Sequence, residues 1–213
     1  MSKDLTPEKA RIFRIIHRDN MPWVFANGLH CRSSGTIDAN YVGIGNPELI
    51  AKRRGHPVPC QPGGTLSDYV PFYFTPFSPM LYNIYTGYAG IQKRDNQEIV
   101  ILVSSLPLLR RKNVEFLFTD RHAYLAAAQF HSDLAQLDQI DWGMLQQRDF
   151  KKNPDNPDRF ERYQAEALVH KVLPLDALLE IVCYDDSAAS GLCGHMAAHT
   201  LDIPIVAKPS WYF

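Results

Sequence analysis

The segment 151–158 constrains this chain strongly, because it holds two prolines and four Asp or Asn residues in eight positions. Proline lacks a backbone N–H, and Asp and Asn favour turns, so neither a helix nor a strand is expected to run through it. The apolar run Ala167–Val169 follows shortly and predicts the start of a buried strand. Glu166 therefore stands where a polar loop meets the core, and partial desolvation there can raise the pKa of its carboxyl group. Such a group suits proton transfer or the stabilisation of a developing positive charge, although a salt-bridged glutamate at a strand end is the commoner outcome.

Length and composition predict one globular domain over residues 1–213. Hydrophobic residues make up 46% of the chain and charged residues 21%, which is typical of a folded protein with a sizeable core. The N-terminal residues lack the apolar centre of a signal peptide, and no apolar run reaches the ~20 residues that span a bilayer, so we expect a cytoplasmic protein. The four cysteines form no Cys-x-x-Cys pair, which favours reduced thiols over a structural zinc site. The net charge of −1 means that any contact to nucleic acid must come from a local patch.

Strand and helix patterns follow one another irregularly, which predicts an α+β fold and not an evenly alternating doubly wound sheet. Besides the strand that starts near Ala167, we expect strands at 11–17, 29–32, 70–75, 98–104, 115–119, 178–184 and 203–208. We expect helices at 22–27, 47–54, 80–85, 123–130, 134–150 and 188–200. The loops 33–46, 55–69 and 149–161 exceed the usual connection length, which often marks binding segments.

Two motifs resemble known functional motifs, but each lacks a residue that the function requires. The glycines of Gly43-Ile44-Gly45 resemble a dinucleotide loop, yet a third glycine is missing and Pro47 follows, so we expect a turn that leads into a helix. His195 and His199 lie four residues apart as in metalloproteases, but the catalytic glutamate and a third ligand are missing. We therefore expect no metal site. The basic run Lys52–Arg54 is more informative, because an arginine on a helix before a Gly/Pro-rich loop can hold a diphosphate.

Polar residues gather where four of the expected apolar strands stop. These clusters are 17–20, 73–75, 120–122 and 164–166, and each alone is explained well by capping or by a buried hydrogen-bonded pair. Together they predict one cleft lined by His17, Tyr73, His122 and Glu166.

Six short motifs in order make the chain resemble the DarT family of DNA ADP-ribosyltransferase toxins, over most of its length. They are Ile15–Asn20 with Gly28 and Leu29, Asn46–Arg53, Val70–Pro76 with Pro79–Leu81, Phe118–Ala123, Arg162–Glu166 and Trp211–Phe213.

The resemblance implies an ADP-ribosyltransferase fold, whose split β-sheet carries short flanking helices and holds NAD⁺ in its cleft. It implies transfer of ADP-ribose from NAD⁺ to a base in single-stranded DNA, typically thymidine, within a short sequence context. It also implies a cytoplasmic bacterial toxin whose partner is a macrodomain antitoxin that removes the modification.

By position, the resemblance assigns Glu166 as the catalytic glutamate and gives His122, acting near the substrate, and Arg53 catalytic roles as well. Arg53 is also expected to contact the diphosphate. Arg54 is adjacent to Arg53, and the alignment does not decide between them. The remaining NAD⁺ contacts are His17 and Asn20 on the adenosine or nicotinamide-ribose side, and Tyr73 and Met80 at the nicotinamide.

The implied chemistry agrees with the residues. Cleavage of the nicotinamide–ribose bond develops an oxocarbenium-like cation, which an anion such as Glu166 stabilises, and the same carboxylate can take a proton from a thymine ring. No metal is required. We expect single-stranded DNA to bind through basic loops and by stacking on exposed aromatic side chains, over a short footprint.

Three alternatives stay open at this level. The chain could be a transferase of the same fold that modifies another base, RNA or protein. It could be a catalytically silent nucleic-acid-binding module, although the presence of His17, His122 and Glu166 argues against that. It could also be a structural protein whose polar strand ends only cap the fold.

Overall fold

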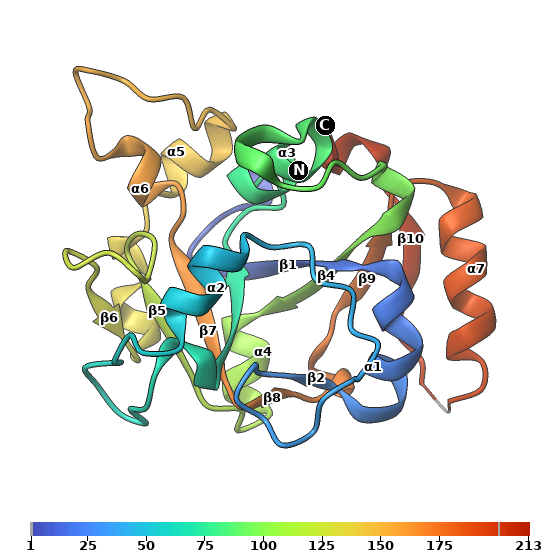
Figure 1. Cartoon of the computed structure of the whole chain (residues 1–213). Helices are drawn as coiled ribbons and strands as arrows, with labels where there is room; N and C mark the ends of the chain where they lie inside the picture. The colour runs from blue at the N-terminus through green and yellow to red at the C-terminus, as the bar shows by residue number, and fades with distance from the viewer. Residues whose placement is uncertain (1, 200) are drawn as a thin grey trace.

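The chain folds around one mixed eight-stranded sheet, with short helices and long loops on its faces and edges (Figure 1). A computed structural model describes residues 2–199 and 201–213. The sheet strands are β1 (Arg11–His17), β3 (Tyr69–Tyr73), β4 (Ile99–Ser105), β5 (Phe116–Thr119), β6 (Phe130–His131), β7 (Glu166–His170), β9 (Glu180–Cys183) and β10 (Ile205–Ala207). A separate pair is formed by β2 (Leu29–His30) and β8 (Val172–Leu173).

The order of the strands explains why the sheet is split. The order is β10-β9-β4-β1-β3-β7-β5-β6, and every pair is antiparallel except β9 with β10. β1 pairs with β4 along its whole length, from Arg11 opposite Ser105 to His17 opposite Ile99. β1 pairs with β3 at one position only, Phe13 opposite Tyr73. The two halves of the sheet therefore meet at a single register point, and a cleft can open between β1 and β3.

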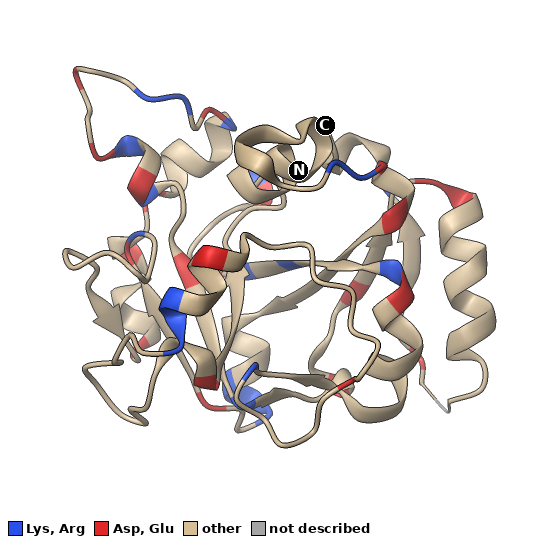
Figure 2. Ribbon diagram, in the orientation of Figure 1, with Lys and Arg blue, Asp and Glu red and all other residues tan. Residues whose placement is uncertain are grey.

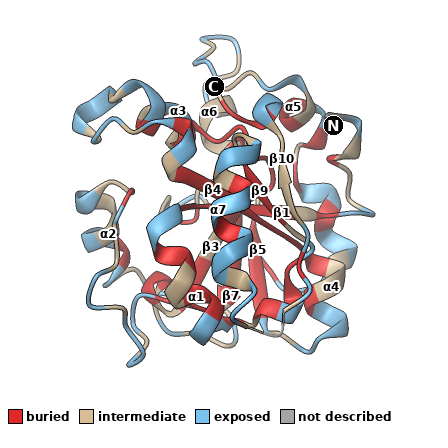
Figure 3. Cartoon of the chain, turned by 90° about the vertical axis from the view of Figure 1, so that its right-hand side faces the viewer, coloured by how far each residue is buried: buried red, intermediate tan, exposed pale blue. Residues whose placement is uncertain are grey.

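Burial follows the sheet, as the apolar strand runs predict (Figure 3). Every residue of β4 is buried, which confirms it as a central strand. At the chain's end the Tyr212 hydroxyl donates to two neighbouring strands, at the Ile99 and Val182 carbonyls. No helix among the described residues has both the length and the apolar character needed to cross a membrane.

The helices are short and begin at recognisable caps. Asn46 accepts from the amides of Glu48 and Leu49 at the start of α2, and Ser78 accepts from Leu81 at the start of α3. The α-helices are α1 (Met21–Asn27), α2 (Pro47–Arg53), α3 (Pro79–Thr86), α4 (Leu106–Arg111), α5 (Trp142–Gln147), α6 (Arg159–Arg162) and α7 (Asp186–Met196). α7 packs against β10 and α1 at one side of the sheet.

Three helix predictions need correction. Residues 123–130 form turns that lead into β6, because Asp120 closes this loop by accepting from the Gln129 amide at 2.9 Å. That local closure outweighs the helix propensity of the alanines. The expected helix 134–150 is divided into the 3₁₀ segment Leu134–Gln139 and α5, which Asp141 caps as predicted. The expected helix 188–200 begins earlier, in α7, and ends at Met196, while Thr200 lies outside the described residues.

Candidate functional site

Glu166 is the first residue of β7 and its side chain is buried, with 3% of the residue exposed. Its backbone is fixed on both sides, since Tyr73 of β3 lies opposite it and the Thr119 hydroxyl at the end of β5 accepts its N–H at 3.2 Å. The irregular segment that precedes Glu166 gives way to a strand at this point, because Ala167 and Leu168 are core residues. The carboxylate is therefore carried by the end of an interior strand, held between β3 and β5.

Three groups surround the Glu166 carboxylate. Arg53 Nη1 donates to Oε2 at 2.9 Å and to Oε1 at 3.2 Å, and the Ala123 amide donates to Oε1 at 3.0 Å. The His122 Nδ1 atom lies 3.1 Å from the same Oε1. Burial raises the pKa of Glu166, but the charges of Arg53 and His122 and the hydrogen bonds outweigh it, so the pKa lies below its ordinary value. The expected rise in this pKa was therefore wrong, and the group is a carboxylate at neutral pH.

Arg53 is the last residue of α2 and is 9% exposed, whereas its neighbour Arg54 is exposed. Both line the same cleft, but within the described residues it is Arg53 that bonds Glu166. The second terminal nitrogen of Arg53, Nη2, is buried and has no hydrogen-bond partner among the described residues. Because a buried unpaired donor is costly, this N–H group suits an anionic or polar ligand in the cleft.

His122 sits on the loop that follows β5. Its Nδ1 atom lies between two groups, the Tyr124 amide at 3.2 Å and Glu166 Oε1 at 3.1 Å. An unprotonated Nδ1 accepts from the amide, whereas a protonated Nδ1 donates to the carboxylate. The Thr119 hydroxyl fixes the loop by donating to the Arg121 carbonyl at 2.6 Å. The imidazole is therefore held beside the Glu166 carboxylate.

These side chains line one cleft of about 470 Å³, a size typical of ligand sites. Its walls come from β1 and β3 where the sheet splits, from α2, and from the loop 31–46 that runs across the front of the sheet (Figure 1). Of the predicted site residues, it is lined by Arg53, Tyr73, Met80, His122 and Glu166. Five of the predicted groups thus meet in one place, although five different elements of the chain supply them.

Tyr73 and Met80 form one side of the cleft. The Tyr73 hydroxyl lies 4.0 Å from the Met80 sulfur. Burial, followed by the nearby Glu166 charge, raises the pKa of Tyr73 well above its ordinary value, so the phenol stays neutral. A flat ring and a polarisable thioether together suit an aromatic ligand.

The other two predicted residues are not among those that line the cleft. His17 is buried, with Nε2 3.3 Å from Glu98 Oε1 and 3.2 Å from Arg94 Nη1. Asn20 is also buried, and its amide group makes two hydrogen bonds to the backbone of Val42, at 2.8 and 2.9 Å. Asn20 therefore anchors the loop 31–46, and direct contact of either residue with a ligand stays a prediction.

Sequence reasoning missed two anchors of the site. The Ala123 amide is a backbone group, which no residue pattern marks. Asp68 anchors the start of the loop 31–46, because its carboxylate accepts from the Ser33 hydroxyl at 2.6 Å and from the Lys171 ammonium at 2.5 Å. The same carboxylate accepts from the Thr65 amide at 2.7 Å, in a capping box. The signal was the spacing from Thr65 to Asp68, which is that of a helix cap.

Among the described residues, no group of three His, Cys, Asp or Glu side chains is arranged to hold a metal ion.

Comparison with known proteins agrees with this geometry. The family model described as "ssDNA thymidine ADP-ribosyltransferase, DarT" matches residues 13–213. A DNA ADP-ribosyl transferase of Escherichia coli O127:H6 is 52% identical over 212 residues, which covers 100% of this chain and 97% of the relative. Two solved structures of the Thermus sp. 2.9 DarT are similar over 97% of this chain. The complex with ADP-ribosylated ssDNA has a TM-score of 0.87 at 31% identity over 98% of its chain, and the complex with NAD⁺ has 0.82 at 32% over 99%.

Proposed function

The chain belongs to the DarT family of single-stranded-DNA thymidine ADP-ribosyltransferases, and on that premise we propose the roles of the residues in its cleft. It is an NAD-dependent DNA ADP-ribosyltransferase, which transfers ADP-ribose from NAD⁺ to thymidine in single-stranded DNA. The observation that carries the proposal is the buried Glu166 carboxylate, held by Arg53, His122 and a backbone amide in a cleft of about 470 Å³.

Glu166 acts on the charge that develops as the reaction proceeds. NAD⁺ supplies the ADP-ribosyl group through its nicotinamide–ribose bond. The Glu166 carboxylate stays ionised at neutral pH, so it can stabilise positive charge on the ribose as that bond breaks. Because β7 and Thr119 hold its backbone, little reorganisation is needed at the moment of reaction.

The fit to NAD⁺ rests on the polar and aromatic groups of the cleft. The buried Arg53 Nη2 is a donor that lacks a partner among the described residues and is suited to a diphosphate or ribose oxygen. Tyr73 and Met80 provide a neutral, polarisable surface for the nicotinamide ring. Asn20 acts by fixing the loop 31–46 through Val42, and His17 joins the end of β1 to Glu98 and Arg94.

The acceptor thymidine must lose a ring proton when it is modified. Glu166 and His122 are the candidates to take it, because both line the cleft and their Oε1 and Nδ1 atoms lie 3.1 Å apart. His122 is partly exposed, with 15% of its side chain accessible, whereas Glu166 is covered. We place the DNA base on the His122 side of the cleft for that reason.

The family resemblance supports two further proposals. The protein acts as a bacterial toxin in the cytoplasm, and its partner is a macrodomain antitoxin that removes the modification. Within DNA it prefers a short sequence context around the thymidine.

One experiment tests the function directly. The protein is incubated with NAD⁺ and, separately, with single-stranded DNA, duplex DNA and RNA oligonucleotides, and each product is weighed by mass spectrometry. We expect one added ADP-ribose on thymidine-containing single-stranded DNA only. Consumption of NAD⁺ without any modified oligonucleotide would move the acceptor to protein, and modified RNA would move it to RNA. The absence of both reactions would leave a binding module.

A further inference from the structure

Three tyrosines are exposed on one short segment beside the cleft. Tyr82 and Tyr85 are each 40% exposed and Tyr88 is 66% exposed. Single exposed apolar side chains are ordinary, but a contiguous group of large aromatics marks an interaction surface. We call these three residues the tyrosine ridge.

Local sequence explains why the ridge faces outward. Ser78 caps α3, and the apolar residues Leu81 and Ile84 are buried, which turns the opposite face to solvent. Tyr82 and Tyr85 are three residues apart and share that outer face. Gly87 ends the helix in the left-handed conformation, and the exposed Tyr88 is the first residue of the turn that follows.

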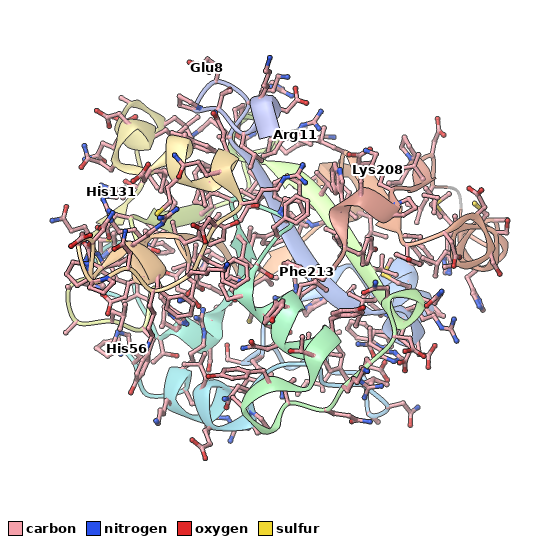
Figure 4. All side chains as sticks on the ribbon, turned by 90° about the horizontal axis from the view of Figure 1, so that it is seen from above. Glu8, Arg11, His56, His131, Lys208 and Phe213 are labelled. Carbon is pink, nitrogen blue, oxygen red and sulfur yellow. The ribbon has the colours of Figure 1, made fainter. Side chains whose placement is uncertain are left out.

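The ridge is joined to the cleft at one end. Met80, in the first turn of α3, lines the cleft. Its methyl group also lies close to Gly45 of the loop 31–46, since a Cβ atom added at this glycine would be 3.5 Å from it. The Tyr82 ring packs edge-on against Phe213 at 5.3 Å and Phe150 at 5.8 Å between centroids. In the view from above, Phe213 lies beside α3 (Figure 4). A DNA strand that leaves the cleft past Met80 therefore reaches the tyrosine ridge next.

The charges around the ridge suit a polyanion. Residues 79–94 contain no Asp or Glu, and the segment ends in Lys93 and Arg94. On the other side, Phe150 is followed by Lys151 and Lys152, which are exposed, as is Lys93. Figure 2 shows that α3 itself carries no charged residue.

We propose that the tyrosine ridge is a stacking platform for the nucleotides that flank the acceptor thymidine, with Lys93 beside their phosphates. This proposal rests on the proposed function, because the acceptor must occupy the cleft. Aromatic side chains bind single strands by stacking on bases of any sequence, and lysines screen the backbone. Tyr82 and Tyr85, both within α3, are ~4.5 Å apart along the helix axis, which is close to the spacing of about 3.4 Å between stacked bases.

The test uses oligonucleotides of increasing length around one core sequence that the wild-type protein modifies. For the wild type, KM is expected to fall as flanking nucleotides are added. For the double variant Tyr85→Ala/Tyr88→Ala, this gain is lost, and KM for the longest oligonucleotide rises by about tenfold or more. Tyr85→Phe/Tyr88→Phe keeps the rings and is expected to stay within about twofold of wild type. Leu179→Ala, which truncates an exposed apolar side chain elsewhere, is the matched control.

The outcomes separate the ridge from the function. If the wild type transfers ADP-ribose and the alanine variant shows the same dependence on length, the ridge does not bind DNA and a protein partner becomes its occupant. If the wild type modifies no DNA, the proposed function fails. The affinity of each protein for labelled single-stranded DNA is then measured by fluorescence anisotropy. Equal affinity of the wild type and the alanine variant would overturn the proposed role of the tyrosine ridge.

Discussion

Arg53 and Glu166 are 113 residues apart in sequence, yet one guanidinium nitrogen spans both carboxylate oxygens, at 2.9 and 3.2 Å. The pair joins the end of α2 to the start of β7 across the cleft. Each partner lowers the cost of burying the other, and removing one from such a pair typically costs ~3–5 kcal/mol. The pair therefore affects both the stability of the protein and the chemistry of the site, so both stability and activity must be measured for each variant.

Replacing Glu166 with glutamine keeps the shape of the side chain and removes its charge. We expect kcat to fall by about 10²- to 10³-fold, because the group acts on developing charge. NAD⁺ affinity is expected to change by less than about threefold, since transition-state interactions contribute little to ground-state binding. Calorimetric titration with NAD⁺ and a thermal unfolding curve accompany the rate measurement. Undiminished activity in a folded variant would remove Glu166 from the mechanism.

Arginine-to-alanine variants at the two adjacent positions distinguish the roles of Arg53 and Arg54. Arg53→Ala removes a buried partner of Glu166 and the unpaired Nη2 donor, so both stability and NAD⁺ affinity should fall, the latter by about tenfold or more. Arg54→Ala alters an exposed side chain and is expected to change affinity by less than about threefold. The reverse order of the two dissociation constants would assign the ligand contact to Arg54.

Helical periodicity explains why the sequence alone could not decide between these arginines. Leu49 and Ile50 both line the cleft, and Arg53 lies four residues after the first while Arg54 lies four after the second. The helix therefore turns both side chains towards the cleft. The deciding partner is Glu166, and its position depends on the pairing of β7 with β3, which no local pattern contains.

The strands were predictable for a different reason. Apolar runs such as Ile99–Ser105 are buried on both faces, so their sequence alone shows their place in the sheet. The loop after β5 was not predictable, because its conformation depends on the Asp120 carboxylate reaching Gln129, nine residues on. The lowered pKa of Glu166 was missed likewise, since burial was visible in sequence and the charges of Arg53 and His122 were not.

Asp68→Asn tests the anchor of the loop 31–46. Hydrogen bonds from Lys171, Ser33 and the Thr65 amide hold the pKa of Asp68 well below its ordinary value. The stability contributed by this carboxylate is therefore present above the unfolded pKa of about 3.9 and is lost as the pH falls towards the folded pKa. We expect the variant to be less stable at pH 7 by about 2 kcal/mol, or roughly 4–8 °C in Tm.

The pH dependence provides the internal control for Asp68. Urea unfolding of both proteins at pH 7 and pH 3 should give a smaller difference at pH 3, where the unfolded aspartate is largely protonated. A difference of equal size at both values would mean that packing, and not the ionised carboxylate, is lost in the variant. The KM for NAD⁺ is expected to rise as well, because Ser33 ties Asp68 to the loop 31–46, which forms one wall of the cleft.

Thr119 is a positioning residue, since its hydroxyl accepts the Glu166 N–H at 3.2 Å and donates to the Arg121 carbonyl at 2.6 Å. Thr119→Val preserves the shape of the side chain but removes the partner of the buried Glu166 N–H, at a cost of ~1–3 kcal/mol, and of the partly buried Arg121 carbonyl. We expect kcat to fall by about tenfold, because sub-ångström shifts of a catalytic group are costly, while the affinity for NAD⁺ changes less. Thr119→Ser restores the hydroxyl and should recover most of kcat. A merely structural role would lower Tm in the valine variant without moving kcat at temperatures where the protein stays folded, so equal kcat in valine and serine variants would contradict the positioning role.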